Sequence, residues 1–552
     1  MKKLFLTAAS VAALLAAAPA ALAADIDPAR IAAHVKVLAS DEFEGRGPAT
    51  EGEKKAVAYI AEQYKAVGLK PAGDLQKDGA RAWTQDVPLA KFDIAGPVAV
   101  SVKAGDETLT WAQGEQVALR ASALGVDHVS IKDAPIVFAG YGVSAPERQW
   151  NDFKGMDLKG KVVLVLVNDP DFETGQGDFG GKAMTYYGRW TYKYEEAARQ
   201  GALGLLVVHE TAPASYGWAT VKNSNTNTIF DIIRDKPAEA HPLMEGWIQR
   251  DATVELLKRA GLDFEALKKQ AQSRDFQPQL LSGVTFTTDY AVDAQKIVSK
   301  NVVGMVEGAK RPNERIIYSS HWDHLGIGLP DAKGDRIYNG AVDNADGVAT
   351  MIEIARAFTA AKTPQRTVVF LAVTAEEKGL LGSEYYAANP LYPLATTVAD
   401  INMDALRPGG PARDFTTSGD APLSLQDDLI AAAKANGLYY SPDPRPEAGS
   451  FFRSDHFPFA KRGVPAISYG SGEDLVVGGR EAGKAFGKAY TADKYHQPAD
   501  EYDDSWNLEG VAKDAKVMFD LGENLANSTT WPEWKAGAEF KAERDKTAAQ
   551  RK

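Results

Sequence analysis

The stretch from Ser319 to Gly347 constrains the fold of this chain more than any other part of it. Residues 315–319 are rich in β-forming types and predict a short buried strand, and residues 348–361 carry apolar side chains at helical spacing. A strand, a polar loop and a helix in this order place His321 and Asp323 at the carboxyl end of a strand, where open α/β sheets bind ligands. A histidine and carboxylates at such an edge suit a metal site.

Strands and helices continue to alternate along the second half of the chain. The candidate strands are Asn301–Val306, Arg315–Ser320, Thr367–Val373, Val398–Met403 and Pro465–Tyr469. Helical patterns lie between them. Because strands that alternate with helices form parallel sheets, the predicted fold class is α/β, with a mostly parallel central sheet and helices on both faces.

Residues 98–284 have a different pattern and are called the insert from here on. Short β-type runs separated by turn residues dominate it, and one clear helical pattern covers residues 192–200. The insert is therefore predicted to be β-rich, with its histidines (His128, His209 and His241) in structural or surface roles. The predicted domains are a signal peptide (1–23), a discontinuous α/β domain (24–97 plus 285–530), the insert, and a charged C-terminal tail (531–552).

The N-terminus predicts export. Residues 1–23 combine a Met-Lys-Lys start, an apolar run and Ala21-Leu22-Ala23, which is typical of a secretory signal cut after Ala23. The alternative is an N-terminal membrane anchor, which the short apolar run disfavours. No other stretch is apolar enough to span a bilayer, so a soluble periplasmic or secreted protein is expected.

Composition limits the chemistry that this chain can use. Among its 552 residues, 62 are Lys or Arg and 74 are Asp or Glu, which gives a net charge of −12 and no sign of a basic nucleic-acid footprint. The chain has eight histidines and no cysteine. Any metal site must therefore use imidazole and carboxylate ligands, and disulfides are excluded.

Residues suited to metal binding follow the ends of consecutive predicted strands. They are His321, Asp323, Asp343, Glu376, Glu377 and Asp404, and His496 lies in a later turn-like segment. Each alone has an ordinary explanation as a cap, a solvated helix start or a surface histidine, but their convergence at one sheet edge favours a metal site. Two imidazoles and three or more carboxylates exceed the ligand set of one tetrahedral zinc, so two ions are expected, with a helix-start carboxylate able to bridge them.

These residues lie in five motifs that resemble the di-zinc exopeptidase family of the secreted bacterial leucyl aminopeptidases, which also includes glutamate carboxypeptidase. The motifs are Ser320-His321-Trp-Asp323-His324, Gly340-Ala-Val-Asp343-Asn-Ala-Asp346-Gly347, Thr374-Ala-Glu376-Glu377-Lys-Gly379-Leu-Leu-Gly382-Ser383, Asn402-Met-Asp404 and Tyr495-His496-Gln-Pro498-Ala-Asp500. The resemblance covers residues 27–87 and 297–527 and implies the zinc exopeptidase fold.

The resemblance also implies a role for each matching residue. One Zn²⁺ would be held by His321, Asp343 and Asp404, and a second by Asp343, Glu377 and His496; Mn²⁺ or Co²⁺ are possible replacements. Glu376 would be the general base that takes a proton from the metal-bound water and passes it to the leaving amine. Asp323 would orient His321 by accepting its imidazole N–H, and Tyr495 would donate its hydroxyl to the oxyanion.

Three further segments resemble parts of this family. The insert, through residues 136–143, 158–165 and 193–208, resembles a protease-associated domain that would cover the active site. The loop Ser40–Arg46 resembles the loop that opens many relatives and is expected to contribute to the cleft. Residues 449–457 resemble the substrate-side loop, where Arg453 would anchor a substrate carboxylate and Phe451 or Phe452 would line the side-chain pocket.

The function implied is an exported di-zinc aminopeptidase that acts on peptides. A carboxypeptidase or dipeptidase of the same family is the main alternative, because the polarity of an exopeptidase depends on pocket shape. Glutaminyl cyclisation on the same fold, which uses one zinc in relatives, is a third possibility. A non-catalytic peptide-binding protein is the fourth.

Overall fold

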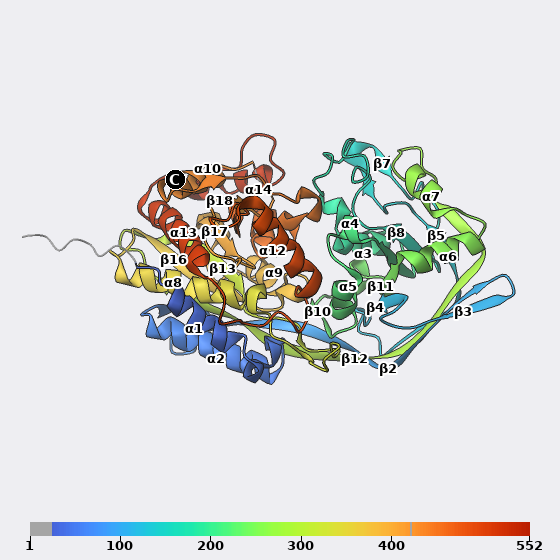
Figure 1. Cartoon of the computed structure of the whole chain (residues 1–552), viewed down its shortest axis with the longest axis horizontal. Helices are drawn as coiled ribbons and strands as arrows, with labels where there is room; N and C mark the ends of the chain where they lie inside the picture. The colour runs from blue at the N-terminus through green and yellow to red at the C-terminus, as the bar shows by residue number, and fades with distance from the viewer. Residues whose placement is uncertain (1–24, 420–421, 552) are drawn as a thin grey trace, which may run out of the picture.

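The structure is a computed structural model, and it describes residues 25–419 and 422–551. It has two lobes, which lie side by side in Figure 1: an α/β lobe and the insert. The signal peptide predicted for residues 1–23 lies outside the described residues. Among the described residues, no helix is both long and apolar enough to cross a membrane.

The α/β lobe is built on a twisted sheet whose central strands are parallel. Strands β20, β17, β13 and β16 are mutually parallel in this order, and β12 and β18 pair antiparallel at either side. Their bounds are β12 Gln279–Val306, β13 Arg311–His321, β16 Arg366–Val373, β17 Thr397–Met403, β18 Asp414–Thr417 and β20 Ala466–Ser471. The predicted α/β fold class with a mostly parallel sheet is therefore confirmed.

Helices cover both faces of this sheet, as the all-buried strand β16 requires. On one face, α8 (Asp346–Ala360) and α13 (Glu509–Asn527) pack together, and the hydroxyl of Tyr318 donates to the carbonyl of Met518 in α13 (2.6 Å). On the other face, Ser319 donates to Asn402, whose amide reaches Ser454 beside α11 (His456–Lys461). The alternation of Tyr318 and Ser319 follows from the strand period of two.

The remaining helices of this lobe surround the same core. Their bounds are α1 Pro28–Leu38, α2 Glu51–Ala66, α9 Leu381–Ala388, α10 Ser424–Ala435 and α12 Gly479–Asp493. Asp27 and Thr50 cap α1 and α2 by accepting a backbone N–H with their side chains.

The insert has more helix than the sequence predicted. Strands β5 (His128–Phe138), β8 (Val162–Leu166), β9 (Gly204–His209) and β11 (Met244–Gln249) are parallel neighbours, and β4 (Val117–Leu119) pairs antiparallel at the edge. The accompanying helices are α3 Trp190–Arg199, α4 Thr211–Ala214, α5 Trp218–Asn225, α6 Arg250–Arg259 and α7 Phe264–Gln270. Most of these helices are short, so their periodicity is weak against the clear apolar runs of the strands.

Two long strands join the lobes. Strand β2 (Thr84–Ala104) pairs antiparallel with β12 from Thr84 opposite Val302 to Ala104 opposite Val284. Both strands run across the positions at which the sequence placed the ends of the insert, near residues 97 and 284. The lobes are therefore connected by a continuous ribbon of sheet, visible along the base of Figure 1.

The C-terminal segment packs against the α/β lobe. Trp534 is 3% exposed and donates its indole N–H to the carbonyl of Gly463 (2.9 Å). Phe540 stacks on Phe451 with a centroid distance of 6.1 Å and an interplanar angle of 11°. Arg544 donates to the carbonyl of Thr397 (2.9 Å). Two aromatic anchors and a buried arginine thus hold a segment that its charged sequence alone presented as a tail.

Candidate metal centre

The strand-end residues gather at one edge of the sheet. His321 is the last residue of β13, Glu376 and Glu377 lie in the turn after β16, and Asp404 follows β17 directly. Because these strands are parallel neighbours, their carboxyl ends meet at the same edge. The structure therefore brings these side chains together at that edge.

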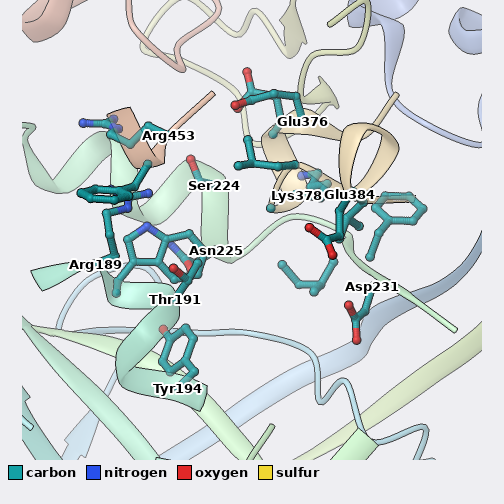
Figure 2. A pocket seen from close by; sticks show the side chains of 18 of the residues that line it. Arg189, Thr191, Tyr194, Ser224, Asn225, Asp231, Glu376, Lys378, Glu384 and Arg453 are labelled. Carbon is teal, nitrogen blue, oxygen red and sulfur yellow. The ribbon is translucent and has the colours of Figure 1, made fainter. Parts of the chain in front are cut away.

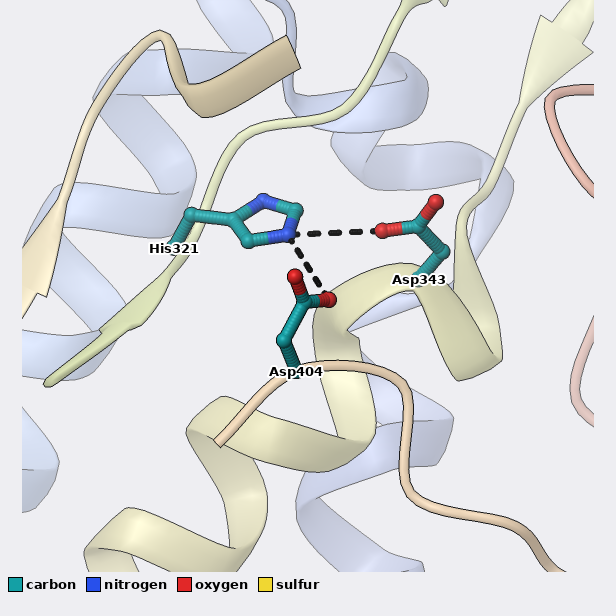
Figure 3. A group of neighbouring side chains, drawn as sticks. All are labelled: His321, Asp343 and Asp404. Atoms are coloured by element: carbon teal, nitrogen blue, oxygen red, sulfur yellow. Dashed lines mark hydrogen bonds and ion pairs between the residues drawn. The ribbon is translucent and has the colours of Figure 1, made fainter. Parts of the chain in front are cut away.

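A first group of side chains surrounds the His321 imidazole (Figure 3). Its Nε2 atom lies 3.3 Å from Oδ1 of Asp343 and 3.4 Å from Oδ1 of Asp404. Asp343 comes from the turn before α8, so the group joins three separate segments. These three residues have ligand atoms within 4.8 Å of one another, close enough to hold one metal ion.

A second group lies on the other side of Asp343. Nε2 of His496 is 3.3 Å from Oδ2 of Asp343 and 3.0 Å from Oε2 of Glu377. The two oxygens of Asp343 therefore face one imidazole each. Burial alone would raise the pKa of Asp343, but the hydrogen bonds from His321 and His496 outweigh burial and hold it well below its usual range.

His324 is a further imidazole in this second group, and the sequence analysis gave it no role. It is fully buried, and its Nδ1 lies 2.6 Å from Oε1 of Glu377. Ligand atoms of His324, Asp343 and Glu377 also lie within 4.8 Å of one another. Nε2 of His496 faces both carboxylates, whereas the ion pair of His324 is with Glu377 alone. The only sequence signal was its place three residues after His321.

Asn344 connects the segments that carry the first group. Its Nδ2 atom donates to Oγ of Ser320 and to the carbonyl of Met403 (3.0 Å each), and its Oδ1 accepts from the N–H of Ala405 (3.2 Å). A Cβ atom at Gly347 would lie 2.1 Å from Oδ1 of Asn344, so only glycine fits this position. One amide side chain thus fixes the neighbours of His321, Asp343 and Asp404.

Asp500 anchors the Asp343 turn from the opposite side. Its Oδ1 accepts from the N–H of Val342 and its Oδ2 from the N–H of Asp343 (3.1 Å each). Tyr490 donates to the same Oδ2 (3.1 Å). The turn that presents Asp343 is therefore held by a carboxylate four residues after His496.

The predicted role of Asp323 needs a correction. The Nδ1 atom of His321 hydrogen-bonds the backbone carbonyl of Asp323 (3.1 Å), whereas the carboxylate Oδ1 is 3.8 Å away. That carboxylate accepts instead from the N–H of Glu376 (3.1 Å). The chain turns after His321, so the carbonyl faces the imidazole and the Asp323 side chain faces the Glu376 turn.

The donor set fits divalent metal ions. Carboxylate oxygens of Asp343, Glu377 and Asp404 each lie within 3.4 Å of an imidazole nitrogen of His321 or His496. Like charges that share a buried site favour a cation between them. Imidazole and carboxylate are ordinary zinc ligands and also accept other divalent ions.

Glu376 lies beside the first group without joining it. Its Oε2 is 3.9 Å from Nε2 of His321, and the side chain lines the two adjoining cavities. Burial, with the nearby carboxylates of Asp404 and Glu377, raises the pKa of Glu376 well above its usual range although His321 opposes the shift. A carboxyl group with a raised pKa next to the ligands is suited to accept and return a proton.

The side chains of Tyr495 and Arg453 contact each other beside Glu376 and line the same cavities. Nη2 of Arg453 donates to the hydroxyl oxygen of Tyr495 (3.0 Å). The ring of Tyr495 packs on the ring of His496 with a centroid distance of 3.9 Å. Burial raises the pKa of Tyr495, so its hydroxyl keeps its proton. The hydroxyl hydrogen remains available for donation into the cavities.

Two cavities flank the centre. The larger, of about 340 Å³, lies between the lobes, and Figure 2 shows Glu376 and Arg453 across from insert residues that include Arg189, Tyr194 and Ser224. The smaller, of about 200 Å³, adjoins Asp343 and Asp404. Phe452 lines the larger cavity. Phe451 lines neither, because it packs on Phe540 and His456.

The parallel sheet and the imidazole and carboxylate groups at its edge are compatible with a metal-dependent enzyme. Residues 301–520 match the model of peptidase family M28. This segment therefore belongs to peptidase family M28, and the expected family is confirmed for it. The enzyme class expected from the sequence, a zinc-dependent peptidase, agrees with this family.

Two curated relatives of this chain are also named as peptidases. A glutamate carboxypeptidase 2 homolog of Caenorhabditis elegans is 23% identical over 425 residues, which cover 65% of this chain and 49% of that protein. A probable zinc metalloprotease of Pyrenophora teres f. teres is 36% identical over 116 residues, 21% of this chain and 24% of that protein. The chain thus spans half or less of the length of these curated relatives.

A solved structure shares the fold over most of the chain. The aminopeptidase from Aneurinibacillus sp. strain AM-1 aligns with a TM-score of 0.53 at 20% identity, covering 91% of this chain and 94% of that one. At this identity the likeness establishes the architecture of both lobes and does not extend to the activity.

Proposed function

We propose that this chain is an exported di-zinc aminopeptidase that releases the N-terminal residue of peptides. The observation that carries the proposal is the position of Asp343, whose two oxygens face the imidazoles of His321 and His496. A carboxylate placed in this way suits two ions a few Å apart, the arrangement of aminopeptidase-type sites. The predicted signal peptide supports export, with a mature protein that starts at Ala24.

The residues present would hold two ions. His321, Asp343 and Asp404 would hold the first, and Asp343, Glu377 and His496 the second. When bound at such a site, zinc lowers the pKa of water and polarises the peptide carbonyl. The insert, which we assign as a protease-associated domain, covers the cavity in which the peptide would lie.

The side chains around the ligands would transfer the proton, stabilise the oxyanion and position the Glu376 turn. Glu376 takes a proton from the attacking water and returns it to the leaving amine, for which its raised pKa is suited. Tyr495 donates its hydroxyl hydrogen to the developing oxyanion, and Arg453 holds that hydroxyl in place. Asp323 fixes the Glu376 turn through the backbone N–H of Glu376.

A panel of aminoacyl p-nitroanilides, run beside peptides with blocked N-termini, tests this proposal. Release of the chromophore from free-amine substrates only, abolished by chelation and restored by zinc, is the expected result. Full activity after rigorous metal removal would contradict the metal-dependent mechanism. Equal cleavage of blocked and free substrates would contradict the aminopeptidase assignment.

Carboxypeptidase or dipeptidase activity is the second candidate, and one observation favours it. Arg189 and Arg453 both line the larger cavity, and neither forms an ion pair with a carboxylate among the described residues. The Nε atom of Arg189 is buried and has no hydrogen-bond partner. Two unneutralised guanidinium groups suit the free carboxylate of a short peptide. Comparison of dipeptides with the corresponding dipeptide amides distinguishes the two activities.

A further inference from the structure

We propose that Ser224, from helix α5 of the insert, is a positioning residue of the metal centre. Its Oγ lies 2.8 Å from Nδ1 of His496. The other ring nitrogen, Nε2, is the one that faces Asp343 and Glu377. The inference rests on the proposed function, because it assigns His496 as a ligand of the second ion.

The hydrogen bond to Ser224 is compatible with the tautomer of His496 that a metal ligand needs. A neutral imidazole that binds a metal through Nε2 must carry its proton on Nδ1. The Ser224 oxygen can accept a hydrogen bond from that Nδ1–H, and the contact holds the plane of the ring. Partners of this kind commonly orient metal-bound histidines. Here the partner comes from the other lobe, 272 residues away in the sequence.

The rest of α5 and the residues after it dock on the same segments. Asn223 donates its amide to the backbone carbonyl of His496 (3.0 Å), and Asn227 donates to the carbonyl of Leu325 (2.9 Å). His496 has a left-handed backbone with φ of 55°, a conformation that costs energy for a non-glycine residue and needs support from its surroundings. The insert supplies this support, so it does more than cover the cavity.

The two metal sites differ in this dependence. Nδ1 of His321 hydrogen-bonds the carbonyl of Asp323, which belongs to the α/β lobe itself. The first site is therefore complete without the insert, whereas the second site depends on Ser224. Loss of the Ser224 hydroxyl is expected to lower the affinity for the second ion and to leave the affinity for the first unchanged.

The test uses the full chain and zinc itself as the probe. Zinc binding to the wild type and to Ser224→Ala is measured by competition with a chromophoric chelator and by elemental analysis. For Ser224→Ala, the dissociation constant of one ion is expected to rise about 10- to 100-fold, while the other keeps its wild-type value. Ser282→Ala, an exposed serine of the insert, is the matched control and should bind as the wild type.

A second pair of variants separates the hydroxyl from the shape of the side chain. Ser224→Thr and Ser224→Val have the same shape and differ by a hydroxyl against a methyl group, so any packing cost is shared. Ser224→Thr is expected to bind the second ion more tightly than Ser224→Val, with the first ion bound equally by both. Equal zinc affinities for Thr and Val, or equal weakening of both ions in Ser224→Ala, would overturn the role of Ser224. A wild type that binds no second ion would instead overturn the proposed function on which the inference rests.

Discussion

The Nη2 atom of Arg46 donates to the backbone carbonyl of Gly340 at 2.9 Å, three residues before Asp343. The same guanidinium group donates through Nε to the carbonyl of Trp322 (2.7 Å), beside His321, and through Nη1 to those of Leu38 and Asn339 (2.6 Å each). Burial lowers the pKa of Arg46 to about 10, so it remains charged at neutral pH. A single cation from the N-terminal loop thus ties together the two segments that present His321 and Asp343.

Replacement of Arg46 by Met is expected to destabilise the protein. The substitution leaves buried carbonyls without donors, and each such group costs about 1–3 kcal/mol. The free energy of unfolding should therefore fall by about 3 kcal/mol or more in urea titrations. Lys36→Met, at a residue whose side chain is 62% exposed, should change it by less than about 1 kcal/mol. Equal stability of the two variants would show that Arg46 does not organise these loops.

Glu376→Gln is expected to lose kcat, whereas Glu377→Gln is expected to lose zinc. Without the Glu376 carboxylate the proton has no acceptor, so kcat should fall about 10²- to 10⁴-fold while zinc content stays at the wild-type level. Glu377→Gln should lose zinc, because Oε2 of Glu377 faces His496 in the second site. Steady-state kinetics with elemental analysis of the same samples separates the two effects. A Glu376→Gln variant with wild-type kcat would remove Glu376 as the base.

Arg189→Met is expected to affect substrates according to their C-terminus. If the guanidinium group binds a free carboxylate, its loss should raise KM for dipeptides about 10- to 100-fold, the equivalent of one hydrogen bond between charged groups. The corresponding dipeptide amides should keep their KM. Arg189→Lys retains the charge without the planar guanidinium group, so its KM for dipeptides should lie between those of the wild type and Arg189→Met. An equal change for acids and amides would exclude a carboxylate subsite at Arg189.

The insert contains an imidazole whose charge stabilises the fold. His241 lies 2.7 Å from Oε1 of Glu245 and 3.1 Å from Oδ2 of Asp231. Burial alone would lower the pKa of His241, but the carboxylates of Glu245 and Asp231 outweigh it and raise the pKa to about 9. The folded state therefore binds the proton more tightly than the unfolded chain, whose histidine pKa is about 6.5. This stabilisation is complete below about pH 6.5 and is lost as the pH rises through about 9.

His241→Gln tests this contribution to stability. The difference in unfolding free energy between the wild type and the variant should be largest near pH 6 and should fall on the order of 3 kcal/mol toward pH 10. His128→Gln, at an exposed histidine, should differ from the wild type by about 0.5 kcal/mol or less. A difference for His241→Gln that is constant with pH would contradict a protonated His241.

The centre of the fold and its ligand edge could be predicted from the sequence. Strand β16 is an unbroken apolar run, and parallel strands bring residues such as His321 and Asp404 to one edge once the strands are recognised. That argument needs only local patterns, because the rules of sheet topology supply the long-range contacts. Helix α3 follows the predicted pattern at residues 192–200, whereas the other short helices of the insert could not be predicted, since a pattern of two turns cannot be separated from loop.

Contacts between side chains far apart in the sequence could not be predicted. Ser224 touches His496, and Phe540 covers Phe451, but nothing in the local sequence of either pair indicates the other residue. The orientation of Asp323 was predicted wrongly for a related reason. Spacing places a residue near a ligand, whereas the turn after the strand decides whether its carbonyl or its carboxylate faces the imidazole.

The number of zinc ions bound per chain, in the wild type and in Asp343→Asn, tests the central claim most directly. Asp343 faces both imidazoles, so its replacement should lower the affinity for both ions. Asp404→Asn and Glu377→Gln should each lower the affinity for one ion. We predict two zinc ions for the wild type and a rise in both dissociation constants for Asp343→Asn. A wild type that saturates with one ion, or an Asp343→Asn variant that keeps both at wild-type affinity, would contradict the paired site.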